Sequence, residues 1–232
     1  MTETIPVDVG WRVTSPQGAL AFIPPEPIDV PGFEGRVLQV LCPYNARVRK
    51  TPKNQGPARF GLVPEPGGIS QQAFQGLTVP IEPGAQRTTE LPAIQISMNL
   101  IMICEEDCAI HLSAPFFSPA FRDWPGPLVS GRFPLRSWPR PLNAVLEWQD
   151  DGKDWVLRRG EPMAYIWLHF DDPNKVPNVV EAAMTPALKR HFAQVDNVSS
   201  FARNVGPMMD EAARRRPARL LTPKRIGCPD FS

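Results

Sequence analysis

Apolar and polar side chains alternate along several short segments of this chain, which is the pattern of β-strands that bury one face. Three acidic residues at 105–107 separate two such segments, so we expect a hairpin there. An Asp-Gly pair at 151–152 lies between apolar runs at 145–148 and 155–157 and predicts a second hairpin. The clearest alternating segments are 36–50, 94–104, 108–114 and 163–170.

Proline is spread along the whole chain, with 29 residues between Pro6 and Pro229. Because proline lacks the N–H that helices and central strands use, this density divides the chain into short extended segments and turns. Residues 51–76 are rich in glycine, proline, asparagine and glutamine and are expected to form a long loop. We therefore predict a mainly β body over residues 1–172, of the jelly-roll or β-clip type.

The pattern becomes helical in the last quarter of the chain. Thr185 is a suitable N-cap, with Pro186 at the first helical position. The apolar residues that follow at helical spacing are Leu188, Phe192 and Val195. Residues 173–232 are therefore predicted to form a helical tail that packs on the β body.

Charge is nearly balanced, with 25 Lys and Arg against 24 Asp and Glu among 232 residues. A net charge of +1 supplies no broad field for a phosphate backbone or an anionic lipid surface, so neither nucleic acid nor a membrane is expected as a partner. No apolar run approaches the roughly 20 residues of a bilayer helix, and the N-terminus lacks a basic and apolar leader. We expect a soluble, cytoplasmic protein with its four cysteines reduced.

Segment 163–170 distributes its side chains over two faces, since successive residues of a strand point to opposite sides. One face is apolar and suits a core: Ala164, Ile166, Leu168 and Phe170. The other face carries aromatic and polar groups: Tyr165, Trp167, His169 and Asp171. A large aromatic face is unusual on a monomer, so we expect the helical tail to cover part of it, with another subunit or a ligand as the alternatives.

His169 and Asp171 form a His-x-Asp pair, the arrangement with which the facial iron site of a non-haem oxygenase begins. His111 or His191 would have to supply the second histidine, and neither lies on a later strand, where such enzymes usually carry it. The alternative is that the pair marks a strand entering a turn, with Asp171 or Asp172 bonding to nearby backbone. We favour the turn, because so short a match has a high rate of false positives.

Cys104, Cys108 and His111 offer a second metal hypothesis, because thiolate and imidazole are the ligands that zinc prefers. A fourth ligand is not evident, and the spacing is not that of a tight Cys-x-x-Cys turn. A solvated hairpin tip, flanked by two small apolar thiols without metal, is the interpretation we favour.

Arg132, Arg136 and Arg140 are interleaved with Phe133 and Trp138 between prolines. Guanidinium groups in such a setting bind a phosphate or a carboxylate and stack on aromatic rings. The same side chains also suit a crossing loop whose aliphatic stems pack on tryptophans. We favour the crossing loop, because loops often carry function but are more often simple connections.

Segments 126–148 and 156–170, joined by a charged turn, resemble a group of uncharacterised bacterial and phage proteins that share a domain of unknown function. Gly160, Pro162 and Ala164 stand where that family's pattern places them. The resemblance covers about residues 93–170 and implies a β body followed by a helical C-terminal tail.

The same order of a strand, a charged turn and a closing strand is similar to the closing half of the dUTPase-like β-clip fold. Ser130 is the nearest equivalent of an aspartate in the dUTPase motif, and no glycine-rich phosphate loop follows. The resemblance therefore implies the fold without nucleotide hydrolysis.

No catalytic motif is complete, so we expect a binding protein that uses an aromatic and arginine-lined cleft between body and tail. The partner is expected to be a small molecule or a protein, without a cofactor, and a homo-oligomer is allowed. One alternative is a jelly-roll oxygenase dependent on Fe(II), and another is a phage-related structural or assembly protein. The cleft residues are Arg132, Arg136, Trp138, Arg140, Tyr165, Trp167, His169 and Asp171.

Overall fold

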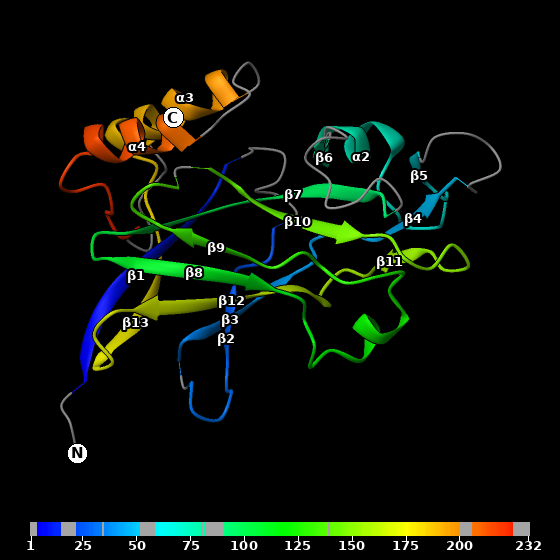
Figure 1. The fold of residues 1–232 in the computed structure, drawn as a ribbon, viewed down its shortest axis with the longest axis horizontal. Helices are drawn as coiled ribbons and strands as arrows, with labels where there is room; N and C mark the ends of the chain where they lie inside the picture. Colours follow the sequence, from blue (N-terminus) through cyan, green and yellow to red (C-terminus); the bar gives the residue numbers. More distant parts are fainter. Residues whose placement is uncertain are drawn as a thin grey trace.

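The computed structural model describes residues 4–14, 22–33, 35–51, 59–79, 81, 91–138, 140–199 and 206–224. The strands in these ranges form two five-stranded sheets and one three-stranded sheet, while helices lie over one side of the molecule (Figure 1). A mainly β body with an appended helical segment was predicted from the sequence, and the structure confirms it.

The first sheet, called the β7 sheet, is built around the longest strand. β1 runs antiparallel to β7 and parallel to β13. Its strands, in spatial order, are β10 (Leu142–Glu147), β7 (Ala93–Cys104), β1 (Ile5–Val13) and β13 (Lys175–Glu181), and β6 (Thr78–Val79) also pairs with β7.

The second sheet, called the β12 sheet, is antiparallel throughout. It consists of β2 (Glu26–Ile28), β3 (Val37–Leu41), β12 (Pro162–Phe170), β8 (Cys108–Ser113) and β9 (Gly131–Pro134). A smaller sheet at one end of the molecule contains β11 (Trp155–Leu157), β4 (Ala46–Lys50) and β5 (Phe60–Leu62).

The β7 and β12 sheets pack face to face, and the main core lies between them. The alternation predicted for 163–170 is confirmed, because the inward residues of β12 are all buried in this core. Burial of this kind contributes roughly 1.5–3 kcal/mol per large aliphatic side chain, which makes it the main source of stability. The inward residues of β12 are Ala164, Ile166, Leu168 and Phe170.

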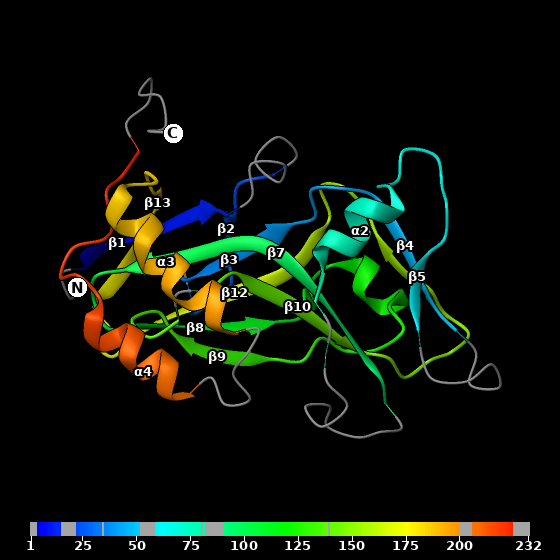
Figure 2. The same cartoon turned by 90° about the horizontal axis from the view of Figure 1, so that it is seen from above.

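Strand β7 is buried on both faces over its last five residues. Leu100, Met102 and Cys104 face the main core, whereas Ile101 and Ile103 face outward and are covered. The cover consists of helix α3 (Pro186–Ser199) and the segment around Leu220. Figure 2 shows α3 lying across β7, with α4 (Gly206–Arg215) beside it.

Helix α3 begins where the sequence predicts. The hydroxyl of Thr185 accepts a hydrogen bond of 3.2 Å from the amide of Leu188, as an N-cap does, and Pro186 opens the helix. None of the helices in the described ranges is long and apolar enough to cross a bilayer.

Both predicted hairpins are wrong, although their strands form at the predicted places. β7 and β8 belong to different sheets, and so do β10 and β11. The residues at 105–107 therefore make an arch that crosses from one sheet to the other. Alternating side chains specify that a strand buries one face, but they do not specify which neighbour it pairs with.

The arch is solvent-exposed at Glu106 and Asp107, as predicted for the turn, but Glu105 is an anchor point. One carboxylate oxygen of Glu105 accepts hydrogen bonds from the amides of Leu220, at 2.5 Å, and Leu221, at 2.6 Å. The other oxygen lies 3.1 Å from the guanidinium of Arg216, which also donates to the carbonyl of Cys104 at 2.6 Å. The acidic turn thus holds the segment that follows α4.

The structure departs from the predicted elements in three further regions. The expected long loop at 51–76 contains β5 and the first part of helix α2 (Gln71–Leu77), which is capped by the Ser70 hydroxyl. The expected helical tail begins with β13, whose parallel pairing with β1 ties it into the body. A short 3-10 helix, η3 (Pro119–Asp123), follows β8.

Candidate binding surface

An aromatic surface lies on the outer face of the β12 sheet. Tyr165 and Trp167 come from β12 itself, on the face opposite the core, as their alternation predicts. Phe33 comes from the β2–β3 connection, and Phe116 and Phe117 come from the segment after β8. These five residues are called the aromatic surface below.

The rings of the aromatic surface hold one another in place. Phe116 stacks on Trp167 with ring centroids 6.0 Å apart and planes inclined by 13°, and Phe33 meets the same indole edge-on at 5.1 Å. The indole N–H of Trp167 donates a 2.8 Å hydrogen bond to the hydroxyl of Ser113. Offset-stacked and edge-on pairs of this kind contribute about 0.5–1.5 kcal/mol beyond the area they bury.

The outermost rings of this surface remain exposed. Phe33, Phe116 and Phe117 are 43%, 49% and 57% exposed. They are three of the five large apolar side chains that the described residues leave exposed; the other two, Ile5 and Val129, lie outside the aromatic surface. A contiguous patch of exposed aromatic rings marks an interaction site more often than scattered apolar residues do.

Two imidazoles and a guanidinium continue this face of the sheet. His111 is the cross-strand partner of Trp167 on one side and of Arg132 on the other. The ring of His169 lies 6.3 Å from that of His111. Partial burial, reinforced by the positive charge of Arg132, holds the pKa of His169 below its ordinary value. At neutral pH this side chain is therefore uncharged and can both donate and accept a hydrogen bond.

The other predicted cleft residues lie elsewhere. Trp138 packs against Phe133 at 4.4 Å and against α4, and the guanidinium of Arg140 sits 5.9 Å from the centre of its ring. Arg136 is exposed and faces the carboxylate of Asp107 at 4.0 Å. Of the three arginines, only Arg132 shares a face with Tyr165 and Trp167. The packing interpretation of this segment therefore holds for Trp138 and Arg140.

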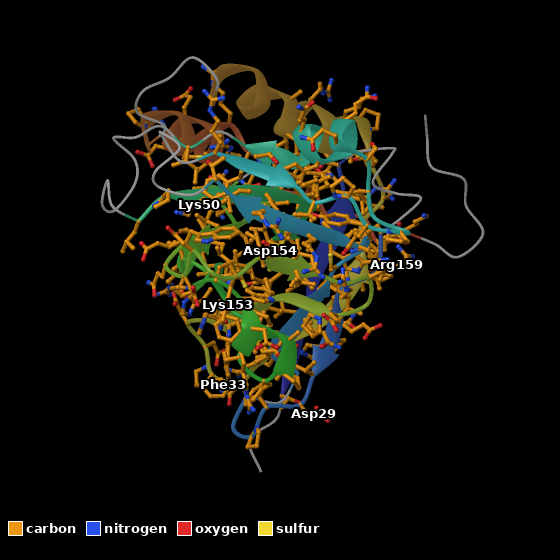
Figure 3. All side chains as sticks on the ribbon, turned by 90° about the vertical axis from the view of Figure 1, so that its right-hand side faces the viewer. Asp29, Phe33, Lys50, Lys153, Asp154 and Arg159 are labelled. Carbon is orange, nitrogen blue, oxygen red and sulfur yellow. The ribbon has the colours of Figure 1, made fainter. Side chains whose placement is uncertain are left out.

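The described part of the helical tail packs on the β7 sheet and not on the aromatic surface, contrary to the prediction; the Val195 side chain of the predicted stripe lies outside the described residues. Leu188 and Phe192 pack on Ile101 and Ile103 of the β7 sheet. Figure 3 shows Phe33 at the opposite end of the molecule from α3. The described residues of the tail therefore form no cleft with the aromatic surface.

The histidines and acids do not assemble the facial site of an oxygenase. His169 and His111 are neighbours, but Asp171 follows the end of β12 as an exposed residue. His191 is a buried residue of α3, near Glu105 and Arg216. Across the part of the chain that the structure describes, no three His, Cys, Asp or Glu side chains meet as metal ligands would. The turn interpretation is supported instead, because a carboxylate oxygen of Asp172 accepts a 2.9 Å hydrogen bond from the amide of Asn174.

The zinc hypothesis fails for a topological reason. Cys104 and Cys108 are free, buried thiols that face the main core and contact each other. His111 lies three residues after Cys108 on β8, and therefore points out of the other face of the sheet. The three side chains do not face one common site.

The charged end of the molecule is internally compensated. Asp154 accepts two hydrogen bonds of 2.7 Å from Arg49, and the nearly buried ammonium of Lys50 lies 2.5 Å from the carboxylate of Asp151. Figure 3 shows Lys50 and Asp154 at this end, at the three-stranded sheet of β11, β4 and β5. Because Arg49 and Lys50 are each matched by a carboxylate, these two cations do not form a free basic patch.

The sequence analysis did not single out Phe33, Phe116 and Phe117. A usable signal was present, because Phe116 and Phe117 are adjacent and lie between Pro115 and Pro119. Two neighbouring rings in a proline-bounded connection fall outside a strand, and connections run over the surface. Their meeting with Trp167 depends on tertiary contacts that no local pattern contains.

Comparisons of the chain with models of protein families, with curated proteins and with solved structures found no match. The resemblances to a family of bacterial and phage proteins and to the dUTPase-like β-clip fold therefore stay predictions from the sequence. Function has to be argued from the surfaces and cavities of this chain.

Proposed function

We propose that this chain is a binding protein that docks on another protein through the aromatic surface. The observation that carries the proposal is that Phe33, Phe116 and Phe117 are exposed together around a tryptophan held by stacking and by a hydrogen bond. Aromatic residues and arginine are enriched in the buried centres of protein interfaces, where a few of them supply most of the affinity. The preorganised rings lose little side-chain entropy on binding.

The partner's chemistry follows from what borders the aromatic surface. Arg132 is exposed and extends from β9 beside the uncharged His169. A guanidinium pairs with a carboxylate through two parallel hydrogen bonds. The partner that fits is a protein segment with apolar side chains for the rings and an acidic residue placed to reach Arg132.

Site-specific photocrosslinking tests this proposal in the cell that makes the protein. A benzophenone amino acid at Phe117 should give one discrete crosslinked product, and the same residue at Val129 should give none. Val129 is the matched control, because it is an exposed apolar side chain outside the aromatic surface. The charge reversal Arg132→Glu should reduce the product at position 117 at least tenfold.

Equal crosslinking at positions 117 and 129 would contradict the proposal. Two further outcomes would change the identity of the partner or the chemistry of its contact with this surface. A product with twice the mass of the chain would mean that a second copy docks there. A product insensitive to Arg132→Glu would mean that the contact is apolar only, without the acidic residue we assign to the partner.

A further inference from the structure

A cavity of about 450 Å³ lies on the other side of the molecule, under helix α2. It is enclosed by one face of that helix, by the end of β3 and the residues after it, and by the middle of β7. Ligand pockets in proteins span roughly 300–1,000 Å³, so the cavity is large enough for a small organic molecule. It shares no residue with the aromatic surface.

The walls are mostly apolar. Val40, Leu77, Met98 and Met163 come from four different elements and surround the cavity, and Phe22 closes one side. None of the described residues that line it is charged. An ion would be desolvated here without a counter-charge from these walls, and such burial is costly.

An irregularity in β7 brings polar groups into this apolar wall. The register between β7 and β10 shifts by two residues, since Leu142 pairs with Leu100 while Asn143 pairs with Ser97. Asn99, inside this bulge, has a φ of 50°, and no other described non-glycine residue has a positive φ. Bulges redirect side chains and are over-represented beside functional sites.

The bulge is stabilised locally by its own hydrogen bonds. The Ser97 hydroxyl donates to the side-chain oxygen of Asn99 at 3.1 Å and accepts from the Asn99 amide at 3.1 Å. The Asn99 carbonyl accepts a 2.9 Å hydrogen bond from the amide of Thr14. The Ser97 and Asn99 pair is thereby fixed in the wall of the cavity.

Tyr44 is a further uncharged polar residue in the wall of the cavity. Its ring lines the space, and burial raises the pKa of its hydroxyl far above the ordinary value. The neighbouring Cys42 thiol is also kept protonated, since burial raises its pKa to about 12. Both groups are neutral across the physiological range, so the polar contacts that the cavity offers are uncharged hydrogen bonds.

We propose that this cavity binds an uncharged, mostly apolar small molecule that carries a hydroxyl or carbonyl group. The apolar body of the ligand fills the space between the methionines and α2, and its polar group faces the Ser97 and Asn99 pair. This site is separate from the docking proposed for the aromatic surface, because the two share no residue, although β12 contributes Met163 to the cavity and Tyr165 and Trp167 to the aromatic surface.

The test uses Prodan, a neutral naphthalene ketone whose fluorescence shifts to the blue in an apolar pocket. Gly76 lines the cavity from α2, and a Cβ added there would meet nothing within 4 Å. Gly76→Leu therefore fills the cavity without a backbone clash. Replacing a helical glycine with a good helix former also favours α2, so the melting temperature should not fall.

Matched variants separate the cavity from other apolar surfaces. Gln75→Leu adds the same side chain at the preceding residue of α2, which does not line the cavity. We expect saturable Prodan binding by the wild type and by Gln75→Leu, with at least tenfold weaker binding by Gly76→Leu. Ala73→Phe, one turn earlier on the lining face, should give the same loss.

The double variant Phe116→Ser, Phe117→Ser should bind Prodan as the wild type does, because these rings belong to the aromatic surface. Loss of binding in that variant would mean that the dye uses the aromatic surface and would overturn the inference. Undiminished binding by Gly76→Leu, or no saturable binding by the wild type, would overturn it as well. Crosslinking at Phe117 is unaffected by any of these results, so the two proposals fail separately.

Discussion

The outer faces of the two large sheets both carry apolar side chains, but one face is covered and the other is exposed. On the β7 sheet, Ile101 and Ile103 are 0% and 3% exposed, because α3 and the segment near Leu220 lie on them. On the β12 sheet, Phe33 and Phe117 are 43% and 57% exposed, and α3 and α4 lie on the side of the molecule that carries β7 (Figure 1). Within the described residues, one face has a cover and the other is open.

The difference has a physical basis in how each face is held. The covered face is aliphatic, and its cover is anchored by Glu105, which binds two backbone amides and pairs with Arg216. The open face is aromatic, and its rings stabilise one another without a cover. The covered face therefore serves stability, and the open face is the one to which we assign the proposed docking.

Truncation of an apolar side chain should therefore have very different effects on the two faces. Leu188→Ala removes a fully buried side chain from under the cover and should lower the free energy of unfolding by about 3 kcal/mol. Phe117→Ala removes a larger but exposed side chain and should change that free energy by no more than about 0.5 kcal/mol. Urea denaturation of both variants measures the contrast, and equal effects would break the distinction between the faces.

Acid should loosen the covered face first. Burial, reinforced by the charge of Arg216, lowers the pKa of His191 to about 4, whereas an unfolded histidine titrates near 6.5. Protons therefore bind the unfolded chain more tightly, so this stability is complete above about pH 6.5 and is lost as the pH falls towards 4. The loss reaches at most about 3 kcal/mol.

The variant His191→Gln isolates this contribution. It should flatten the fall in the free energy of unfolding between pH 6.5 and pH 4, while the smaller part due to His169, whose pKa is also lowered, should remain. Urea titrations at a series of pH values provide the measurement. An unchanged slope in His191→Gln would show that the acid sensitivity arises elsewhere.

Removal of the anchor should detach the cover. Arg216 is nearly buried and bonds both the Glu105 carboxylate and the Cys104 carbonyl. Arg216→Leu keeps most of the aliphatic volume but leaves the carboxylate without its cation, which should cost about 2 kcal/mol. Hydrogen exchange should become faster in α3 and β7 and stay unchanged in β12, and uniform acceleration across all three would contradict a local anchor.

The smallest effect concerns the order of the open face. Ser113→Ala removes the acceptor of the Trp167 indole and should cost about 1 kcal/mol or less, because the indole is only partly buried. The indole should also gain rotational freedom, seen as lower tryptophan fluorescence anisotropy. Ser137→Ala is the control, since its exposed hydroxyl has no part in the aromatic surface. Equal fluorescence anisotropy of the two variants would mean that stacking alone orders Trp167.

Local pattern predicted the individual elements well and their partners poorly. The strands at 94–104 and 108–114, the two faces of β12 and the Thr185 cap all appear where the sequence indicates. Each of these features depends on residues close together in the chain. The pairing of β7 with β1, and of β13 with β1, joins residues far apart in the chain, which alternation does not encode.

The sequence likewise identified some residues of the candidate site correctly and misplaced others. Tyr165, Trp167 and His169 were identified from strand alternation, and Arg132 from its spacing among aromatic residues. Trp138 and Arg140 had equally suggestive surroundings in the sequence, yet they pack against α4 and each other. A short motif contains the chemistry of its side chains, but the direction of each side chain depends on the strand and loop that carry it.

The amino-acid sequence by itself determined the mainly β composition, the boundaries of the long strands and the start of α3, because proline positions, alternation and capping act over a few residues. Only the tertiary structure decided that the acidic residues at 105–107 join two sheets, that the helices cover Ile101 and Ile103, and that Phe33, Phe116 and Phe117 meet around Trp167. These outcomes follow from burial summed over distant segments. Which of two apolar faces obtains the cover depends on where the chain returns after β13 and on the buried anchor that holds it there.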